Sequence, residues 1–321
     1  MRDACSVVPA EPDVAIRSSD GEAVQTSIGA AVQRREGRAA VLGPRQVSLN
    51  GALNTFMVEH LRRAGHDVQV SDLYAMKWKP QLDAADFLDL PAGRRFNPES
   101  DSRDAYERGT QGPDIAAEQR KLQWADTVIL QFPLWWFSMP AILKGWVERV
   151  YANGFGYGVG EHSDKRWGDR YGEGTMAGKR AMLVITTGGW ESHYGPRGIN
   201  GPMQDLLFPI QHGILYYPGF DVLPPFVVYR TGKVDAAAFV QVTEALGRRL
   251  DALATTTPIA YRRQNAGDYE IPAMTLRAGL APGREGFGVH VAAPTEQNSL
   301  RGAPATMESH RPPTRPSARD R

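Results

Sequence analysis

Two tryptophans and a phenylalanine, Trp135, Trp136 and Phe137, stand where a strand should end. They follow residues 127–132, a short apolar run with β-branched residues that is typical of a strand buried on both faces. Pro133 should stop that strand, because proline has no N–H to donate. Ligands of open α/β sheets bind just past the carboxyl ends of strands, so this cluster predicts a site for a flat ring system.

Two further segments suit a phosphate and a ring. Residues 43–50 lead into the N-terminus of an expected helix, which offers unpaired N–H groups to a phosphate. Residues 186–194 follow a buried strand and hold two hydroxyls, two glycines that allow close backbone approach, and Tyr194. Phosphate chemistry at one loop and ring chemistry at the other two predict a flavin nucleotide.

The elements that must position these loops alternate between strand and helix. Strands are expected at residues 39–42, 68–70, 127–132, 181–186 and 221–228. Pro224 and Pro225 make the last one an edge or distorted strand. Helices are expected after a cap at Ser48 or Asn50, at 114–122, at 141–150, from 205 onward, and at 234–252. This order predicts an α/β fold with a doubly wound, five-stranded parallel sheet whose strand carboxyl ends share one rim.

The ends of the chain differ from its middle. Residues 1–37 show little hydrophobic periodicity and predict a disordered or misassigned leader, and the Pro- and Arg-rich residues 293–321 predict a disordered tail. Residues 38–292 are expected to form one domain. The first strand of that domain is thin, which suggests that the leader is a wrong start or a frameshifted segment. Residues 75–112 form a long excursion without a periodic run, and such excursions tend to be functional.

Composition excludes several classes of protein. A net charge of +1 gives no strong electrostatic case for nucleic acid or a membrane surface. No run of 18 apolar residues predicts a membrane span, and the single cysteine excludes a disulfide framework. The histidines show no ligand spacing, so no metal site is expected. His212 is expected to be a satisfied helix residue. A cytoplasmic protein is the default.

Several segments taken together resemble the NAD(P)H:quinone oxidoreductase family, the larger flavodoxin-like enzymes that bind FAD. The main ones are FPLWWFSMPAILKGWVERV, TTGGWESHYGPRGINGPM and GPDIAAEQRKLQWADTVIL, supported by SLNGALN, SDLYAM and LLFPIQHGILYYPGFDVL. The resemblance covers about residues 38–290. It implies a flavodoxin-like fold, noncovalent FAD and a homodimer with active sites at the subunit interface. It also implies a ping-pong cycle in which NAD(P)H gives a hydride to the flavin and a quinone then takes it.

The resemblance assigns roles by position. The pyrophosphate side of FAD should be held by Ser48, Leu49 and Asn50, with Asn97 as a further FAD contact. The isoalloxazine should lie against Pro133, Leu134, Trp136, Phe137, Thr186, Thr187, Gly188 and Gly189. Tyr194 should donate a hydrogen bond to the flavin as charge develops. The substrate pocket should include Trp136, Phe137, Gly189 and His193, with Tyr157 and Tyr217 coming from the partner subunit. Trp135 is expected to be a packing neighbour.

One position departs from the family pattern. Many members have a histidine six residues after the tyrosine, whereas this chain has Asn200. Asparagine can hydrogen-bond to a flavin but takes up no proton at neutral pH, so a proton must come from water or from Tyr194. A branch of mammalian quinone reductases resembles this chain here and prefers simpler nicotinamide donors, which leaves NADH, NADPH and the acceptor undecided.

Three other functions stay open. Some relatives regulate potassium-efflux transporters, and an azo- or nitro-compound reductase would share the chemistry and differ only in acceptor. A flavodoxin-type electron carrier is disfavoured, because such carriers are strongly acidic and this chain has a net charge of +1. A structural alternative is that the aromatic cluster merely fills a core, as most large apolar side chains do.

Overall fold

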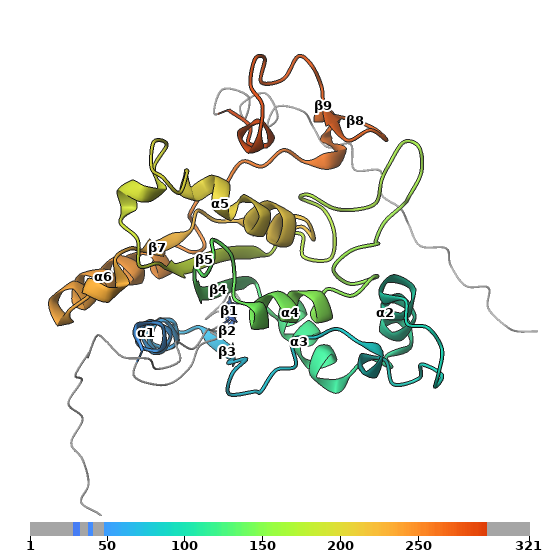
Figure 1. Ribbon diagram of the computed structural model, residues 1–321, viewed down its shortest axis with the longest axis horizontal. Coiled ribbons are helices and arrows are strands. Elements are labelled where there is room, and N and C mark those ends of the chain that lie inside the picture. The colour runs from blue at the N-terminus through green and yellow to red at the C-terminus, as the bar shows by residue number, and fades with distance from the viewer. Residues whose placement is uncertain (1–27, 33–37, 41–47, 294–321) are drawn as a thin grey trace, which may run out of the picture.

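The computed structural model of the protein describes residues 28–32, 38–40 and 48–293 (Figure 1). Most of the predicted leader, residues 41–42 of the predicted first strand, residues 43–47 of the first loop and residues 294–321 of the predicted tail lie outside the described residues. One part of the predicted leader is described: Ile28–Val32 forms a strand, β1, which the sequence did not predict. It runs antiparallel to two strands of the central sheet.

The central sheet has seven strands within the described residues, where the sequence predicts five. They are β1, β2 (Arg38–Ala40), β3 (Asp67–Ser71), β4 (Thr127–Pro133), β5 (Arg180–Thr186), β6 (Asp221–Val222) and β7 (Phe226–Val228). One added strand is β1, and the other arises because Pro224 and Pro225 divide the predicted last strand in two. The parallel strands follow the order β3, β2, β4, β5 and then β6 with β7. That is the flavodoxin-like order.

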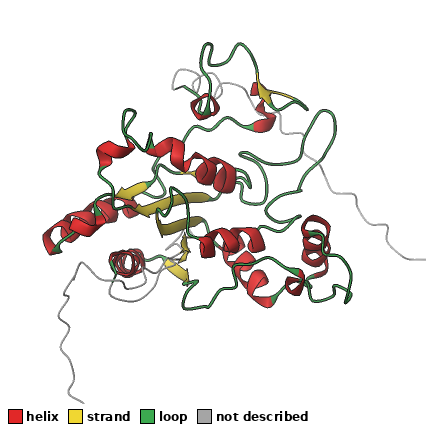
Figure 2. Cartoon of the chain, viewed as in Figure 1, coloured by secondary structure: helices red, strands yellow, loops and turns green. Residues whose placement is uncertain are grey.

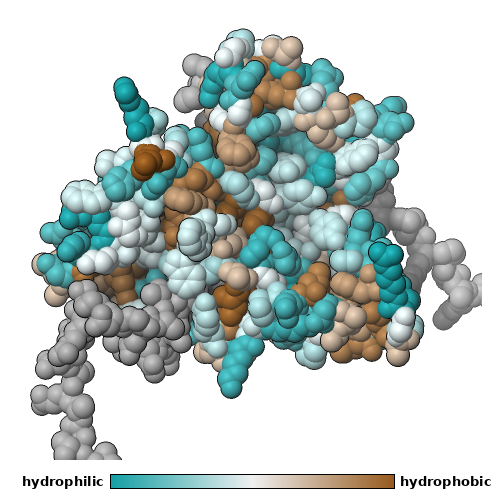
Figure 3. Space-filling view, in the orientation of Figure 1, coloured by the Kyte–Doolittle hydropathy of each residue, from teal (hydrophilic) through white to brown (hydrophobic). Residues whose placement is uncertain are grey.

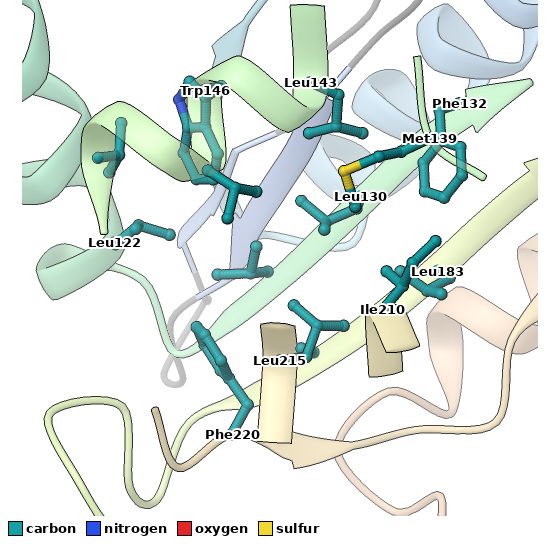
Figure 4. Close-up of a cluster of buried hydrophobic side chains, with 14 of the residues drawn as sticks. Leu122, Leu130, Phe132, Met139, Leu143, Trp146, Leu183, Ile210, Leu215 and Phe220 are labelled. Carbon is teal, nitrogen blue, oxygen red and sulfur yellow. The ribbon is translucent and has the colours of Figure 1, made fainter. Parts of the chain in front are cut away.

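Helices cover both faces of the sheet (Figures 1 and 2). One face carries α1 (Leu49–Arg63) and α6 (Ala236–Asp251), and the other carries α3 (Pro113–Trp124), α4 (Ala141–Val150) and α5 (Met203–Ile210). Because side chains alternate along a strand, Ile129 and Met182 pack on the first face while Leu130 and Leu183 pack on the second. Figure 4 shows Leu130 and Leu183 among side chains from α4 and α5.

The connections contain structure that the sequence did not predict. The excursion at 75–112 holds η1 (Ala84–Asp86) and α2 (Pro98–Arg108), whereas the helix predicted from residue 205 onward is α5 followed by a π-helical turn, η3 (Gln211–Tyr216). The remaining short elements are η2 (Glu191–Tyr194), η4 (Thr231–Lys233), η5 (Gln264–Asp268), the hairpin of β8 (Tyr269–Glu270) and β9 (Thr275–Leu276), and η6 (Phe287–His290). No helix among the described residues is long and apolar enough to cross a membrane.

A buried arginine fixes the excursion to α4. The Arg149 guanidinium donates to Asp86 at 2.7 Å and to Asp114 at 2.7 Å, and it lies 4.5 Å from the centre of the Trp78 ring. A buried charge is tolerated only when it is paired in this way. The helix that follows the aromatic cluster is therefore held from both ends, by the strand before it and by this pair of carboxylates.

Candidate functional site

Strands β4 and β5 bring two of the expected loops to the same level of the rim. The strands pair in parallel from Thr127 with Arg180 to Pro133 with Thr186. The strand ends at Pro133, as predicted, and one further backbone bond follows it, from the Leu134 N–H to the Thr186 carbonyl at 2.8 Å. The loop after β4 and the loop after β5 thus start side by side.

The loop after β4 is a two-residue hairpin, which we call the aromatic turn (residues 135–138). Trp135 and Ser138 exchange both backbone hydrogen bonds, at 3.1 and 3.0 Å. The two central residues have positive φ, 49° at Trp136 and 62° at Phe137. This is the type I′ geometry that normally takes Asn-Gly, since a Cβ makes the left-handed conformation unfavourable. Trp136 and Phe137 therefore have a strained, left-handed backbone conformation.

The strain is not compensated by burial. Trp136 is 94% exposed and Phe137 is 48% exposed, while Trp135 is 39% exposed. The alternative in which the cluster fills a core is therefore wrong for Trp136. A strained backbone that presents a nearly bare indole is the combination found at ligand sites rather than in packing.

Tyr194 ends the loop after β5, which we call the tyrosine loop (residues 187–194), and it is 9% exposed. Its hydroxyl is 2.8 Å from the Thr187 hydroxyl, and either group serves as the donor. A Cβ at Gly189 would come within 2.7 Å of the Tyr194 ring, so this position must be glycine for the ring to lie there. A Cβ at Gly188 would meet nothing within 4 Å, which leaves open space in front of the loop. The Tyr229 ring packs 5.8 Å from Tyr194.

A buried polar network lies beneath the rim. The Thr186 hydroxyl donates to the Asn50 side chain at 3.0 Å, and the Gln131 amide donates to the Asn50 carbonyl at 2.8 Å. Asn54 donates to Gln131 at 3.3 Å. All four residues are buried, so these bonds fix the first turn of α1 against β4 and β5. The sequence analysis missed Asn54 and Gln131, although a glutamine inside the apolar run of β4 was a signal.

The network changes what the first loop can offer to a ligand. The Asn50 side chain is engaged with Thr186, and the Ser48 hydroxyl caps α1 by accepting from the Gly51 N–H at 3.1 Å. Asn50 lies inside α1, so Ser48 is the cap. What remains for an anion are the N–H groups of the first turn, including those of Leu49 and Asn50, which have no intrahelical partner.

An arginine that the sequence analysis missed flanks the tyrosine loop. Arg230 donates its N–H to the Gly189 carbonyl at 3.0 Å, and its guanidinium lies 3.7 Å from the centre of the Trp190 ring. Its φ of 54° is again in the left-handed region. A cation held over the ring of Trp190, the residue after Gly189, suits an anionic group at the rim.

The loop between η2 and α5 carries Asn200. Its N–H donates to the His193 carbonyl at 3.0 Å, and the neighbouring Ile199 is 93% exposed. Figure 3 shows a small hydrophobic patch standing out near this loop, apart from the other hydrophobic patches of that face. His193 is exposed beside it. The catalytic role of Asn200 and the substrate role of His193 stay predictions.

Three predicted site residues have other contacts in the structure. Asn97 caps α2, where its side chain accepts from the Glu99 and Ser100 N–H groups at 3.1 and 3.2 Å. Tyr157 accepts through its backbone from Gly154, and Tyr217 packs edge-on against Tyr171 at 5.0 Å. The structure joins none of the three to the aromatic turn. Their roles toward FAD or across a subunit interface stay predictions.

His212 differs from the prediction of a satisfied residue. Its ring stacks between Phe208 at 4.5 Å and Tyr171 at 4.7 Å, and its buried Nε2 has no hydrogen-bond partner among the described residues. Burial, assisted by the nearby His290, lowers the pKa of His212 to about 4. It is therefore neutral at pH 7.

Residues 41–250 match a family model described as a flavodoxin-like fold. The chain belongs to this family. It is 53% identical to a ribosyldihydronicotinamide dehydrogenase-like protein of Penicillium crustosum, over 81% of this chain and 97% of that protein. It is 40% identical to NAD(P)H dehydrogenase [quinone] 1 of Rattus norvegicus, over 71% of this chain and 81% of the relative.

A solved structure supports the same family. The chain is 63% identical to a protein from Klebsiella pneumoniae whose crystal structure is described as that of a quinone reductase, with a TM-score of 0.76 over 79% of this chain and 97% of that one. Family members with these names are oxidoreductases, so membership makes the present chain an oxidoreductase of the quinone reductase family.

Proposed function

We propose that the protein uses noncovalently bound FAD to carry two electrons from NAD(P)H to a quinone, in a ping-pong cycle, as a homodimer. The observation that carries this proposal is the aromatic turn. An exposed Trp136 on a left-handed backbone is costly in the free protein, and a flat ring lying on it would supply the missing contacts. The family's quinone dehydrogenases support the same reaction.

The residues at the rim fit such a cofactor. Trp136 and Phe137 would cover one part of the ring system, and the backbone of Thr187 to Gly189 would approach it closely because Gly188 faces open space. The N–H groups at the first turn of α1 would hold the pyrophosphate. When bound, a flavin supplies the carrier that accepts a hydride from the donor and passes it to the quinone.

Tyr194 and Thr187 would stabilise the negative charge that develops during hydride transfer and would help to supply the proton. The Tyr194 hydroxyl is held at 2.8 Å by Thr187, so it is already oriented at the rim and would donate a hydrogen bond where negative charge develops. Asn200 would hydrogen-bond without taking a proton. Protons would therefore arrive from water or through Tyr194, and Trp136 and Phe137 would exclude bulk water from the ring.

An alternative is the regulatory subunit of a potassium-efflux transporter. A relative with such a name, an ancillary protein of a glutathione-regulated potassium-efflux system of Enterobacter, is 36% identical over 38% of this chain and 61% of its own length. The quinone dehydrogenases match more of both chains. No feature of the described structure favours the alternative.

The proposal is tested by the flavin spectrum of the purified protein, followed by anaerobic titration with NADH, NADPH or ribosyldihydronicotinamide and then with menadione. We expect a donor to bleach the band at roughly 450 nm and menadione to restore it. Purified protein that retains no flavin and takes up none, or a band that no donor bleaches, would contradict the proposal.

The role of Tyr194 is tested by replacing Tyr194 with Phe, which should slow flavin reduction about tenfold to a thousandfold, the scale of losing one transition-state donor. Thr187→Val is the matched control. It removes the partner of Tyr194 but keeps the phenol, so we expect a smaller loss. Stopped-flow reduction rates for the two variants decide the order. Equal rates in Tyr194→Phe and the unmodified protein would remove Tyr194 from the mechanism.

A further inference from the structure

A cavity lies on the α5 side of the sheet edge. It has a volume of about 810 Å³ and is bounded by α5, the connection between β6 and β7, and the C-terminal segment from Ile259 to Ala293. Its wall is mostly apolar, with Phe208, Pro225 and Tyr261 among the lining residues. This volume falls within the range of small-molecule sites, which are concave, largely apolar and supplied with few polar groups.

One wall of the cavity is the end of a row of rings, which we call the ring stack: Tyr171, His212, Phe208 and Phe287. Neighbouring ring centres lie 4.7, 4.5 and 4.4 Å apart, with interplanar angles of 25°, 14° and 11°. The outermost ring, Phe287, lines the cavity and is 46% exposed. A flat ring of a ligand could stack on Phe287 at a similar distance between ring centres.

The cavity also has a polar group that needs a partner. Gln211 lines it and is 2% exposed, and its Nε2 has no hydrogen-bond partner among the described residues. An amide N–H₂ group is only a donor, so the group that satisfies it must be an acceptor. Leaving such a group unpaired is costly, whereas a ligand carbonyl would satisfy it.

We propose that this cavity binds a planar aromatic compound that bears a carbonyl group, with the ring against the ring stack and the carbonyl accepting from Gln211. The site is separate from the aromatic turn but shares a wall with the catalytic region. Tyr229 lines the cavity and packs 5.8 Å from Tyr194, and Glu191 lines it from the tyrosine loop. An occupant would therefore contact the support of Tyr194 without covering the flavin site.

The experiment compares 9-fluorenone with fluorene, two planar molecules of nearly the same shape that differ by the carbonyl oxygen. Both are titrated by calorimetry into the full-length protein as purified with its cofactor. We expect fluorenone to bind about fivefold to tenfold more tightly than fluorene, the value of one hydrogen bond to a buried donor. Gln211→Leu should remove that preference, and Phe287→Ala should weaken both ligands about fivefold or more.

The controls separate this site from the flavin site and from misfolding. Val240→Ala changes an exposed apolar residue of α6 outside the cavity and should leave both affinities unchanged. Because Phe287 is half exposed, its truncation should leave the fold intact even where Gln211→Leu unfolds the protein. Equal affinities for fluorenone and fluorene, or binding that Trp136→Ala abolishes and Phe287→Ala leaves unchanged, would overturn the proposal. None of these readouts depends on quinone reduction.

Discussion

The molecule holds two groups of aromatic residues that differ in backbone strain and in how tightly their rings pack. In the aromatic turn, Trp136 and Phe137 sit on a left-handed backbone with little packing around Trp136. In the ring stack, Phe208 and His212 lie face to face at 4.5 Å and make contact on both sides. Aromatic content alone does not mark a site. Exposure combined with strain marks the aromatic turn, because it is unfavourable in the free protein and a bound ring would compensate for it.

The largest changes in stability and in FAD affinity should follow when the aromatic turn is given the residues that its backbone conformation favours. Trp136→Asn combined with Phe137→Gly places Asn-Gly in a type I′ turn. We expect the flavin-free protein to become more stable by about 1–2 kcal/mol, through relief of strain. Affinity for FAD should fall about a hundredfold, because two stacking rings are lost. Thermal unfolding and fluorescence titration with FAD measure the two effects.

The matched control for the turn is Phe208→Leu in the ring stack. This change should lower stability and leave FAD affinity within about twofold, since a packed ring contributes to the core rather than to the cofactor. If the Asn-Gly variant were less stable than the original turn, the strain argument would fail. If FAD affinity fell equally in both variants, the two aromatic groups would not differ in function.

The next effect concerns the pH dependence of the ring stack. Burial lowers the pKa of His212 to about 4, below the usual value of 6.5 that it regains on unfolding. Above pH 6.5 both states are neutral and stability is full. As the pH falls from 6.5 toward 4, the unfolded chain takes up a proton that the folded state resists. We expect the free energy of unfolding to fall by about 2 kcal/mol over this window.

His212→Phe is the control, because it keeps a ring between Tyr171 and Phe208 but cannot titrate. Urea unfolding at pH 7, 6 and 5 should show a shallower decline in this variant. Some decline should remain, since burial also lowers the pKa of His290. Parallel curves for the variant and the original protein would show that His212 does not titrate as its burial requires.

The smallest effect separates two adjacent glycines of the tyrosine loop. Gly189→Ala would press a Cβ against Tyr194 at 2.7 Å, so we expect a loss of about 1 kcal/mol of stability from overpacking. Gly188→Ala meets open space, so flavin-free stability should not change, whereas FAD should bind less tightly because the methyl group occupies the space in front of the loop. Chemical denaturation and FAD titration of both variants check this. Equal changes in stability and in FAD affinity in the two variants would show that the flavin ring does not lie in front of Gly188.

Much of the fold could be predicted from local patterns. The buried runs that became β4 and β5 are apolar and contain β-branched residues, so the sequence predicts them as strands. Each predicted boundary lies within one residue of the observed one. Short or polar elements escaped. The helix α2 has few apolar residues, and β1 depends on pairing with β3 and β4 rather than on its own composition. Pro224 and Pro225 predicted a distorted last strand. The sequence could not show that the distortion would separate it into two strands, β6 and β7.

The candidate site was predicted in part. The pairing of Tyr194 with Thr187 joins two predicted residues, and the exposure of Trp136 fits its predicted role. Arg230 was missed because only the fold brings its N–H to the Gly189 carbonyl. The assignment of Asn50 to the cofactor did not foresee that its side chain would bond to Thr186, a residue 136 positions away.

The sequence by itself determined the buried strands β4 and β5, the cap at the start of α1 and the alternation of strand with helix, because periodicity, proline and glycine act within a few residues. Only the tertiary structure decided which polar side chains hydrogen-bond to one another and which remain free to bind a ligand. Gln131 and Asn50 became internal supports when β4 met α1, and the Nε2 of Gln211 was left without a hydrogen-bond partner among the described residues when α5 packed against the C-terminal segment. Hydrogen-bond satisfaction depends on three-dimensional neighbours, and no local pattern encodes it.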